Sequence, residues 1–374
     1  MDAQIIRIRG RPGSGFHFGQ RGIGQEESAP CPASDTLFAA LVARLAARAP
    51  EAVDPFMEGF PRWMGGADDL PGDPPFLISS AFPYAGEVRF FPKPEERGAI
   101  GRDQASERRP DAKKLKRATY VSEDIFRSLL EGASLESWAE RAVAIQGGAL
   151  WLAPEELEKL PVALQKQQRY EPEKAAVWTV EQRPRVTLDR ATSRSEIFHS
   201  GCTLYADGCG MWFAIAWRNL ERPVAGRSVR DWLTVLLEDL EQTGLGGLRA
   251  AGMGACAITP DEIVPFPEVN GGLWLTLSRF HPRPEDVTAI TNSRAAYRVV
   301  TVGGWVQVER GPDQRRIPVQ MLAEGAVLGP AGPGPFGDVV DVRPRYENPA
   351  GDLPHPVWRY GLAFPVGFGK GGAP

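Results

Sequence analysis

The residues most able to do chemistry lie at 244–254, Gly-Leu-Gly-Gly-Leu-Arg-Ala-Ala-Gly-Met-Gly, where five glycines surround one arginine. Glycine has no Cβ and reaches positive φ angles, so consecutive amide groups can point into one concavity and hold an anion. The guanidinium of Arg249 would add a charge-assisted fork to the same anion. The alternative is structural, with one glycine capping a helix and the rest forming a turn. The elements on either side of this stretch therefore bear on whether it binds an anion or only caps a helix and forms a turn.

The glycine-rich stretch follows a helix and precedes a strand. Ser228 is a suitable N-cap, and apolar residues at spacings of three and four continue to Leu240, which predicts an amphipathic helix that ends at Gly244. A short strand is expected at 256–258. The carboxyl end of a helix is the negative end of its dipole, so anion binding must come from the loop amides and Arg249. The order also excludes the dinucleotide-binding fingerprint, which follows a strand and opens a helix.

A second glycine-rich loop occupies residues 13–24. It lies between a strand in which isoleucine and arginine alternate and a helix that starts near Ser34 and stops at Pro50. An anion beside the first turn of that helix would gain the positive end of the dipole, although Ser34 is also an ordinary N-cap residue. The candidate contacts in this segment are His17, Gly19, Arg21, Ser34 and Thr36.

A basic insertion is expected near 95–119, where apolar residues almost vanish. Between positions 108 and 117, six basic residues face a single acid, Asp111. Such a segment is typical of a flexible arm that embraces a nucleic-acid backbone, and equally of a solvated loop. The candidate contacts here are Lys113, Lys114, Lys116 and Arg117.

Composition is that of an ordinary globular protein. The chain has 374 residues, 43% of them hydrophobic, which suffices for substantial cores in two domains. Its net charge of −4 excludes a basic field over the whole molecule, so any nucleic-acid surface must be local. No apolar run reaches transmembrane length, the first residues lack a signal-peptide pattern, and the four cysteines are irregularly spaced. We therefore expect a cytoplasmic protein without a membrane partner.

Strand and helix patterns occur in both halves, with too few helices to cover both faces of a parallel sheet, which predicts an α+β fold. The nearly continuous apolar run at 211–217 is typical of a strand buried on both faces. The polar stretch at 165–185, which contains prolines, suggests the domain boundary. We therefore expect an N-terminal domain at 1–180 and a C-terminal domain at 181–374 that carries the glycine-rich loop.

Several motifs together resemble a known family. The pattern Gly246-Gly247-x-Arg249-x-x-Gly252-x-Gly254, between a helix and a strand, resembles the glycine-rich loop of the RAMP superfamily. Within that superfamily the chain is similar to the fourth Csm subunit, a Cas5-like group, of type III-A CRISPR effector complexes, from about residue 4 to the C-terminus. The motifs that carry this similarity are Phe16-His17-Phe18-Gly19, Ser34-Asp35-Thr36-Leu37-Phe38, Phe76-Leu77-Ile78-Ser79-Ser80-Ala81-Phe82-Pro83, Phe90-Phe91-Pro92-Lys93-Pro94 and Leu188-Asp189-Arg190-Ala191-Thr192.

The resemblance implies two ferredoxin-like (RRM-like) domains with loop and arm insertions. It implies a non-catalytic RNA-binding subunit without a cofactor, which serves in antiviral defence and holds the 5′ repeat-derived tag of the CRISPR RNA without contacting DNA directly. Its partners would be the large polymerase-like subunit and the first backbone RAMP subunit, which this chain would bridge. The basic arm would correspond to the thumb of the backbone subunits. The implied RNA contacts are Gly246, Gly247, Arg249, Gly252 and Gly254, with His17, Arg190, Arg194 and His199 as further candidates.

The chain departs from the family pattern at two positions of the glycine-rich loop. The family commonly has a serine after the arginine and an aromatic residue between the last two glycines, where this chain has Ala250 and Met253. The departures put a hydroxyl contact and one stacking ring in doubt.

Three other functions stay open at this point. RAMP relatives include metal-independent endoribonucleases that process CRISPR repeat RNA, and His17 or His199 could act as a general base on a 2′-hydroxyl. A zinc site built from His199, Cys202 and Cys209 would lack a clear fourth ligand and the usual spacing. The chain could also be a structural bridge whose glycine-rich loop contacts protein.

Overall fold

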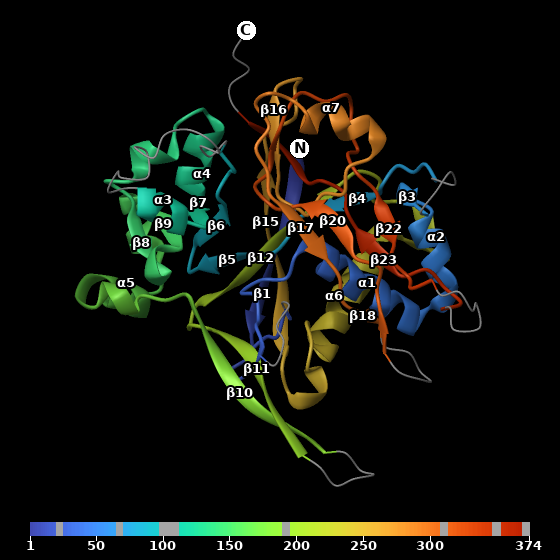
Figure 1. The fold of residues 1–374 in the computed structure, drawn as a ribbon, viewed down its shortest axis with the longest axis horizontal. Coiled ribbons are helices and arrows are strands. Elements are labelled where there is room, and N and C mark those ends of the chain that lie inside the picture. The colour runs from blue at the N-terminus through green and yellow to red at the C-terminus, as the bar shows by residue number, and fades with distance from the viewer. Residues whose placement is uncertain are drawn as a thin grey trace.

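The computed structural model describes residues 1–19, 25–64, 70–96, 112–188, 195–306, 313–345 and 353–368. Arg21, Arg190 and Arg194, three of the expected RNA contacts, lie outside these ranges, as does the basic insertion between 97 and 111. The described chain is a mixed α+β structure, as the sequence patterns predict (Figure 1).

A nine-stranded sheet forms the centre of the molecule, in the order β15-β1-β12-β5-β6-β7-β9-β8, with β4 also paired to β12. Strand β1 (Asp2–Gly10) runs antiparallel to both of its neighbours, β12 (Cys209–Trp217) and β15 (Cys256–Pro265). Residues 209–216 of β12 are all buried, which confirms the expected strand covered on both faces. The other strands are β4 (Phe76–Ile78), β5 (Phe82–Ala85), β6 (Val88–Pro92), β7 (Tyr120–Ser122), β8 (Val143–Ile145) and β9 (Leu150–Leu152).

Helices α1 (Ser34–Arg48) and α6 (Val229–Thr243) pack against each other beside the sheet, and α6 also contacts β15 (Figure 1). Each helix ends where the sequence predicts, α1 just before Pro50 and α6 at the cap residue Gly244. The hydroxyl of Ser228 caps α6 by accepting a hydrogen bond from the amide of Asp231 at 3.1 Å.

The central sheet does not follow the expected division between residues 180 and 181. Its strands β12 and β15 come after that position, and both pair with β1 at the beginning of the chain. The glycine-rich loop joins α6 to β15, so it belongs to the sheet that β1 begins and not to a separate C-terminal unit. The polar stretch at 165–185 is ordered structure, with a helix followed by the first part of a long strand.

A long hairpin leaves the body of the molecule at its lower side (Figure 1). Its strands β10 (Trp178–Leu188) and β11 (Ser195–Tyr205) pair in one uninterrupted antiparallel register, and the short strand β2 (Gln25–Glu26) runs parallel to β11. The neighbouring insertion beside β6–β9 consists of α3 (Ala112–Arg117), α4 (Glu123–Leu130), η3 (Leu135–Trp138), η4 (Gln146–Gly148), η5 (Pro154–Lys159), α5 (Val162–Tyr170) and η6 (Pro172–Lys174).

The remaining chain folds into several small sheets against α1. Strand β16 (Leu273–Thr276) pairs with β21 (Val327–Leu328) and β24 (Pro365–Phe368), and β17 (Val299–Val302) pairs with β20 (Val319–Leu322). The ring centres of Phe38 in α1 and Tyr360 lie 4.9 Å apart, and the hydroxyl of Tyr360 accepts a hydrogen bond from the amide of Ile78 in β4 at 3.0 Å, which ties this part to the central sheet. The other elements are η1 (Pro50–Ala52), α2 (Val53–Met57), β3 (Arg62–Trp63), β13 (Pro223–Val224), β14 (Arg227–Ser228), η7 (Arg249–Ala251), η8 (Pro284–Asp286), α7 (Val287–Ile290), β18 (Trp305–Val306), β19 (Gln314–Arg315), β22 (Val339–Asp341) and β23 (Trp358–Tyr360).

Within the described ranges, none of the helices is both long enough and apolar enough to cross a membrane.

Candidate nucleic-acid interface

The two glycine-rich segments of the sequence meet in space. The amide of Gly247 donates a hydrogen bond to the carbonyl oxygen of His17 at 2.8 Å, and the amide of Gly254 donates one to the carbonyl oxygen of Gly15 at 2.8 Å. The amide of Ala255 donates to the hydroxyl of Ser14 at 3.1 Å. Residues 13–19 therefore hold the glycine-rich loop in place along much of its length.

The shape of the loop requires glycine at its base. The amide of Leu245 donates a hydrogen bond to the carbonyl oxygen of Gly254 at 2.9 Å and closes the loop. Gly254 has a φ angle of 84°, and a Cβ atom there would lie 2.3 Å from the carbonyl oxygen of Leu245. The side chains of Leu245 and Met253 are buried and anchor both ends of the loop.

Arg249 is the exposed charge at the outer turn of the loop. Its side chain forms no ion pair or hydrogen bond with any residue that the structure describes. Within the same described part of the chain, no acceptor is found for the amides of Leu248, Arg249 and Ala250. These groups lie next to one another in sequence, so they can approach a single phosphate together.

Fewer amides of the glycine-rich loop are available to bind a phosphate than the sequence pattern predicts. The amides of Gly247, Gly252 and Gly254 donate to carbonyl oxygens of His17, Arg249 and Gly15 respectively, so they are already used within the chain. The side chain of Met253 is buried and points into the protein. A residue at this position is therefore not placed to stack on an RNA base. In the described part of the chain, the amides of the loop for which no acceptor is found therefore include those at 248–250.

His17 joins three segments at the edge of this loop. Its side chain is only 6% exposed, and Nδ1 is hydrogen-bonded to the carbonyl oxygen of Gly201 in β11 at 2.8 Å. A Cβ atom on Gly247 would lie 3.0 Å from Cδ2 of the imidazole, so the ring packs directly on the loop backbone. Gly19 lies beside Nε2 of the same ring. His17 thus positions the loop and the hairpin, and its burial leaves little surface for RNA.

The first turn of α1 does not form the expected anion site. Ser34 is completely buried, its hydroxyl accepts a hydrogen bond from the amide of Arg279, and the N-cap of the helix is Ala33. The carboxylate of Asp35, in the same turn, pairs with the buried guanidinium of Arg359. Thr36 is half-buried. The carboxylate of Asp35 supplies the negative charge at the first turn of α1. This corrects the expected RNA contact at Ser34, whose hydroxyl is buried and already hydrogen-bonded within the chain.

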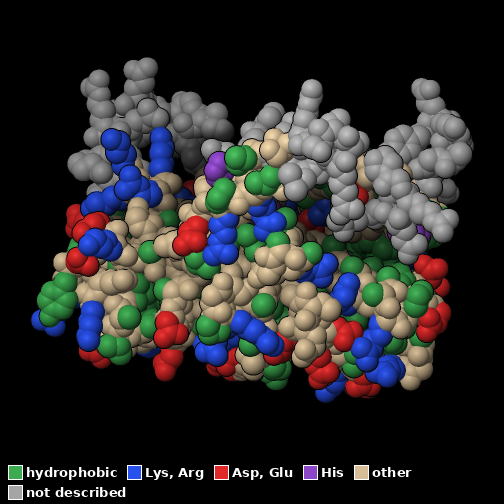
Figure 2. Space-filling view, turned by 90° about the horizontal axis from the view of Figure 1, so that it is seen from below, with side chains coloured by type: hydrophobic (Ala, Val, Ile, Leu, Met, Phe, Trp, Pro, Cys, Tyr) green, Lys and Arg blue, Asp and Glu red, His purple; other side chains and the backbone are tan. Residues whose placement is uncertain are grey.

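The basic residues Lys113, Lys114, Lys116 and Arg117 form helix α3 instead of a loop. Their side chains are exposed. Helix α3 lies beside α4, β7 and β9, away from the end of α6 (Figure 1). Figure 2 shows the lower face of the molecule, where Lys and Arg side chains occur in several separate groups with apolar side chains between them. Such separate basic groups agree with the net charge of −4.

The sequence analysis did not predict the projecting hairpin, although it named His199 of β11 as a candidate RNA contact. Val186 of β10 and Ile197 of β11 form a cross-strand pair and are 57% and 70% exposed. His199, half-buried, follows on the same face of β11, whereas Cys202 is buried on the opposite face, so the two cannot ligate one zinc ion. The sequence around Val186 is polar and contains Pro184, so it gives little indication of the strand that the structure shows here.

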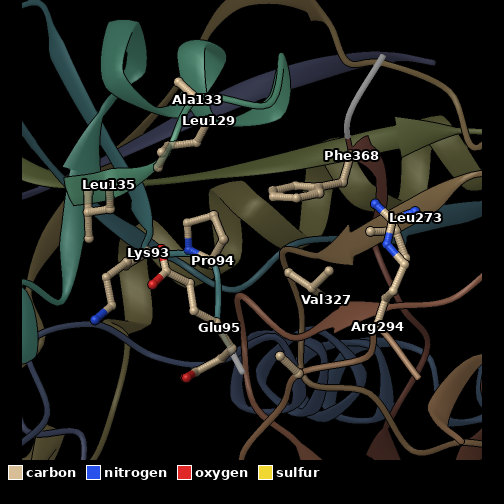
Figure 3. A pocket seen from close by; sticks show the side chains of 12 residues that line it. Lys93, Pro94, Glu95, Leu129, Ala133, Leu135, Leu273, Arg294, Val327 and Phe368 are labelled. Carbon is tan, nitrogen blue, oxygen red and sulfur yellow. The ribbon is translucent and has the colours of Figure 1, made fainter. Parts of the chain in front are cut away.

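The described residues also form a small pocket of about 220 Å³ between α4 and the C-terminal strands. Figure 3 shows Pro94, Leu129, Leu273 and Phe368 around it, with Lys93, Glu95 and Arg294 at its edge. The lining is mainly apolar and contains no histidine, cysteine or hydroxyl side chain that could act as a nucleophile.

Three comparisons with known proteins agree with one another. A family model described as the CRISPR Csm4 C-terminal domain matches residues 269–368. The chain is 26% identical over 348 residues to the CRISPR system Cms protein Csm4 of Thermococcus onnurineus (strain NA1), which covers 90% of this chain and 91% of that protein.

Two solved structures share the fold over the whole chain. A chain of the Csm3-Csm4 subcomplex of the type III-A CRISPR-Cas interference complex superimposes with a TM-score of 0.60 and 15% identity, covering 98% of this chain and 100% of that one. A chain of the Csm1-Csm4 cassette in complex with cA4 gives a TM-score of 0.51 and 19% identity, covering 100% of both chains.

Proposed function

The chain is a Csm4-like protein of the RAMP group, as its motifs predict, and from this premise we propose its function. We propose a non-catalytic RNA-binding subunit of a type III CRISPR effector that holds the 5′ repeat-derived tag of the CRISPR RNA. It bridges a large polymerase-like subunit and a backbone RAMP subunit. Support comes from the assemblies in which its structural relatives were solved, one with Csm3 and one with Csm1.

The observation that carries this proposal is the exposed turn at 248–250. Arg249 offers a guanidinium without a described partner, and three neighbouring amides without described acceptors accompany it. A phosphate of a single-stranded RNA accepts hydrogen bonds from both kinds of group. The turn rests on residues 13–19, which also hold the base of the β10–β11 hairpin through the paired backbones of Phe16 and Thr203. One RNA strand therefore has a phosphate contact and an apolar hairpin within one connected structure.

We assign the part built on the central sheet to the first of two ferredoxin-like domains. The strand order β15-β1-β12-β5, with α1 after β1 and α6 after β12, is that of a βαββαβ unit whose strands are all antiparallel to their neighbours. The elements at 86–208 are then an insertion into this domain. The second domain begins after β15, which agrees with the family match at 269–368.

We propose binding without cleavage because His17 is poorly suited to be a general base. A general base must reach the proton of the attacking hydroxyl, but His17 is 6% exposed and its Nδ1 is engaged by Gly201. Incubation of the purified protein with repeat RNA, in the presence of a chelator, tests the endoribonuclease alternative. Specific cleavage that is lost in a folded His17→Ala variant would overturn the non-catalytic assignment.

The direct test replaces Arg249 by Ala and measures the affinity for a single-stranded RNA with the tag sequence at several salt concentrations. We expect about 10- to 100-fold weaker binding at low salt and a salt slope reduced by about 0.7, since one phosphate contact is lost. Arg294→Ala is the matched control, because Arg294 is also exposed and lies at the edge of the apolar pocket. An unchanged slope for Arg249→Ala, or equal losses for both variants, would contradict the proposal.

A further inference from the structure

The small hairpin of β18 and β19 carries an exposed tryptophan. Trp305 pairs with Arg315 across the hairpin and is 55% exposed, and the guanidinium carbon of Arg315 lies 4.9 Å from the centre of its ring. Val306, the next residue, is 9% exposed and points to the interior. The hairpin thus fixes the indole in place while one ring face packs against a cation and much of the ring stays in contact with solvent.

Positive charge is concentrated beside this ring. The carbonyl oxygen of Gly303 accepts a hydrogen bond from Nη2 of Arg359 at 2.8 Å, and that of Gly304 accepts one from the amide of Arg316 at 2.9 Å. Arg359 is 4% exposed and Arg316 is half-buried. Through Gly303 and Gly304, Arg359 and Arg316 are hydrogen-bonded to the base of the Trp305 hairpin.

The surrounding acids do not neutralise these cations fully. Asp35 pairs with Arg359 and lies 3.7 Å from Arg279, so it already serves two guanidinium groups. The Nε atoms of Arg316 and Arg359 are buried and have no acceptor among the described residues. Burial, and to a smaller extent the charge of Arg359, lower the pKa of Arg316 to about 10. These two arginines lie in the interior, whereas the guanidinium of Arg315, on the exposed face of Trp305, has no ion pair with any residue that the structure describes.

We propose that Trp305 stacks on a base of single-stranded RNA while Arg315 contacts the adjoining phosphate. An aromatic ring flanked by guanidinium groups suits both parts of a nucleotide, since every base offers a π-face and every phosphate a negative charge. A protein partner would also bury the indole, but it would not by itself supply a negative charge to the exposed guanidinium of Arg315. Figure 1 shows β18 in the lower part of the molecule, on the same side as the end of α6 and the β10–β11 hairpin. The inference rests on the proposed function in one respect, namely that the chain works on single-stranded RNA.

The test uses the full chain with Trp305→Ala, Trp305→Phe and Arg315→Gln, and a fluorescent single-stranded RNA of roughly 20 nucleotides that carries 4-thiouridine. We expect Trp305→Ala to weaken binding about tenfold, Trp305→Phe to stay within about threefold of the parent, and Arg315→Gln to reduce the salt slope by about 0.7. Light-induced crosslinks should map to the peptide that contains Trp305, and they should persist in Arg249→Ala at RNA concentrations that restore binding.

The outcomes separate this site from the glycine-rich loop. Crosslinks at Trp305 with no effect of Arg249→Ala would support the inference while contradicting the proposed function at the loop. A clear effect of Arg249→Ala, with unchanged affinity and no crosslink at Trp305, would overturn the inference alone. Loss of binding to a purified Csm1- or Csm3-type partner in Trp305→Ala, with RNA affinity unchanged, would identify a protein interface and would also overturn it.

Discussion

The carbonyl oxygen of His17 accepts a hydrogen bond from the amide of Gly247 at 2.8 Å, which joins the first glycine-rich segment to the second. Gly246, the preceding residue, has a φ angle of 96°, and a Cβ atom there would lie 2.8 Å from the same carbonyl oxygen. Neither the backbone angle nor the contact tolerates a larger residue. The geometry of the exposed turn at 248–250 therefore depends on this junction.

Replacement of Gly246 by Ala should lower the free energy of unfolding by about 1–3 kcal/mol, because the chain must adopt a strained φ angle or move away from His17. Urea denaturation gives this quantity directly. The matched control is Gly272→Ala, since a Cβ at Gly272 would have no atom within 4 Å and its φ angle is not positive. Equal stability of the two variants would show that the junction is not rigid.

A second prediction concerns the ion pair between Asp35 and Arg359, which lie 324 residues apart in the sequence. Their side chains are 1% and 5% exposed, so removal of the carboxylate leaves a buried guanidinium without its partner. We expect Asp35→Asn to lower the free energy of unfolding by about 3–5 kcal/mol. Urea denaturation followed by tryptophan fluorescence and by circular dichroism measures the loss.

Asp73→Asn is the control for this experiment. Asp73 pairs with Arg218 at 2.7 Å, but its side chain is 69% exposed, so the change should cost only about 0–1 kcal/mol. If Asp35→Asn costs no more than Asp73→Asn, the pair does not hold α1 to the C-terminal part of the chain.

The elements that the sequence predicts well are those set by neighbouring residues. The helix that ends at Gly244, its Ser228 cap, the helix that stops before Pro50 and the buried strand at 211–217 are confirmed. Each depends on periodicity, a cap or a helix breaker within a few residues. The similarity to Csm4 proteins can be seen in the sequence for a similar reason, because the glycine-rich motif and the short apolar motifs are local patterns.

Strand pairing was not predictable in the same way. β1 pairs with β12 and β15, which lie more than half the chain away, and no local pattern encodes those partners. The polar, proline-containing sequence at 165–185 suggests a domain boundary, whereas part of it pairs with β11 as a projecting strand. The expected domain boundary near residue 180 rests on composition alone, whereas the central sheet contains strands from both sides of that position.

For the candidate site, the sequence predicts local features and not the contacts between distant segments. The exposed Arg249 in a glycine-rich turn agrees with the sequence pattern. The sequence could not tell that the amides of Gly247 and Gly254 are used by residues 13–19, or that Ser34 is completely buried, because both depend on contacts between distant segments.

A third prediction concerns the apolar face of the β10–β11 hairpin. Ile197 is 70% exposed, so Ile197→Ser should change the free energy of unfolding by no more than about 0.5 kcal/mol. If the hairpin covers bases of the bound RNA, the same change should weaken RNA binding about tenfold, since it removes apolar surface that binding would bury. Fluorescence anisotropy with labelled tag RNA measures the affinity.

The control is Val162→Ser, which removes a 66% exposed apolar side chain from α5. It should leave both stability and RNA affinity close to those of the parent. Equal affinity of the two variants would remove the hairpin face from the RNA-binding surface and leave the Arg249 turn as the contact to be tested.

The last prediction is a pH dependence at the ion pair of Glu123 and Arg89, whose side chains are 17% and 7% exposed. Burial alone would raise the pKa of Glu123, but the ion pair and hydrogen bonds with Arg89 outweigh it, with help from Arg127, and the pKa is lowered. A carboxylate whose pKa is lowered by folding stabilises the native state above its unfolded pKa. That contribution is lost as the pH falls through the folded pKa.

Glu123→Gln should therefore lower the free energy of unfolding by about 2 kcal/mol near neutral pH, less than the loss typical of a broken buried pair because Glu262 still contacts Arg89. The gap between parent and variant should shrink once the pH falls below about 4.5, where the unfolded chain begins to bind a proton that the native chain excludes. Urea denaturation at a series of pH values measures this gap. Glu51→Gln, at an exposed carboxylate without a described ion pair, should show no comparable gap at neutral pH. A gap for Glu123→Gln that stays constant down to about pH 3 would show that the pair contributes through packing, because only the charged carboxylate responds to protonation.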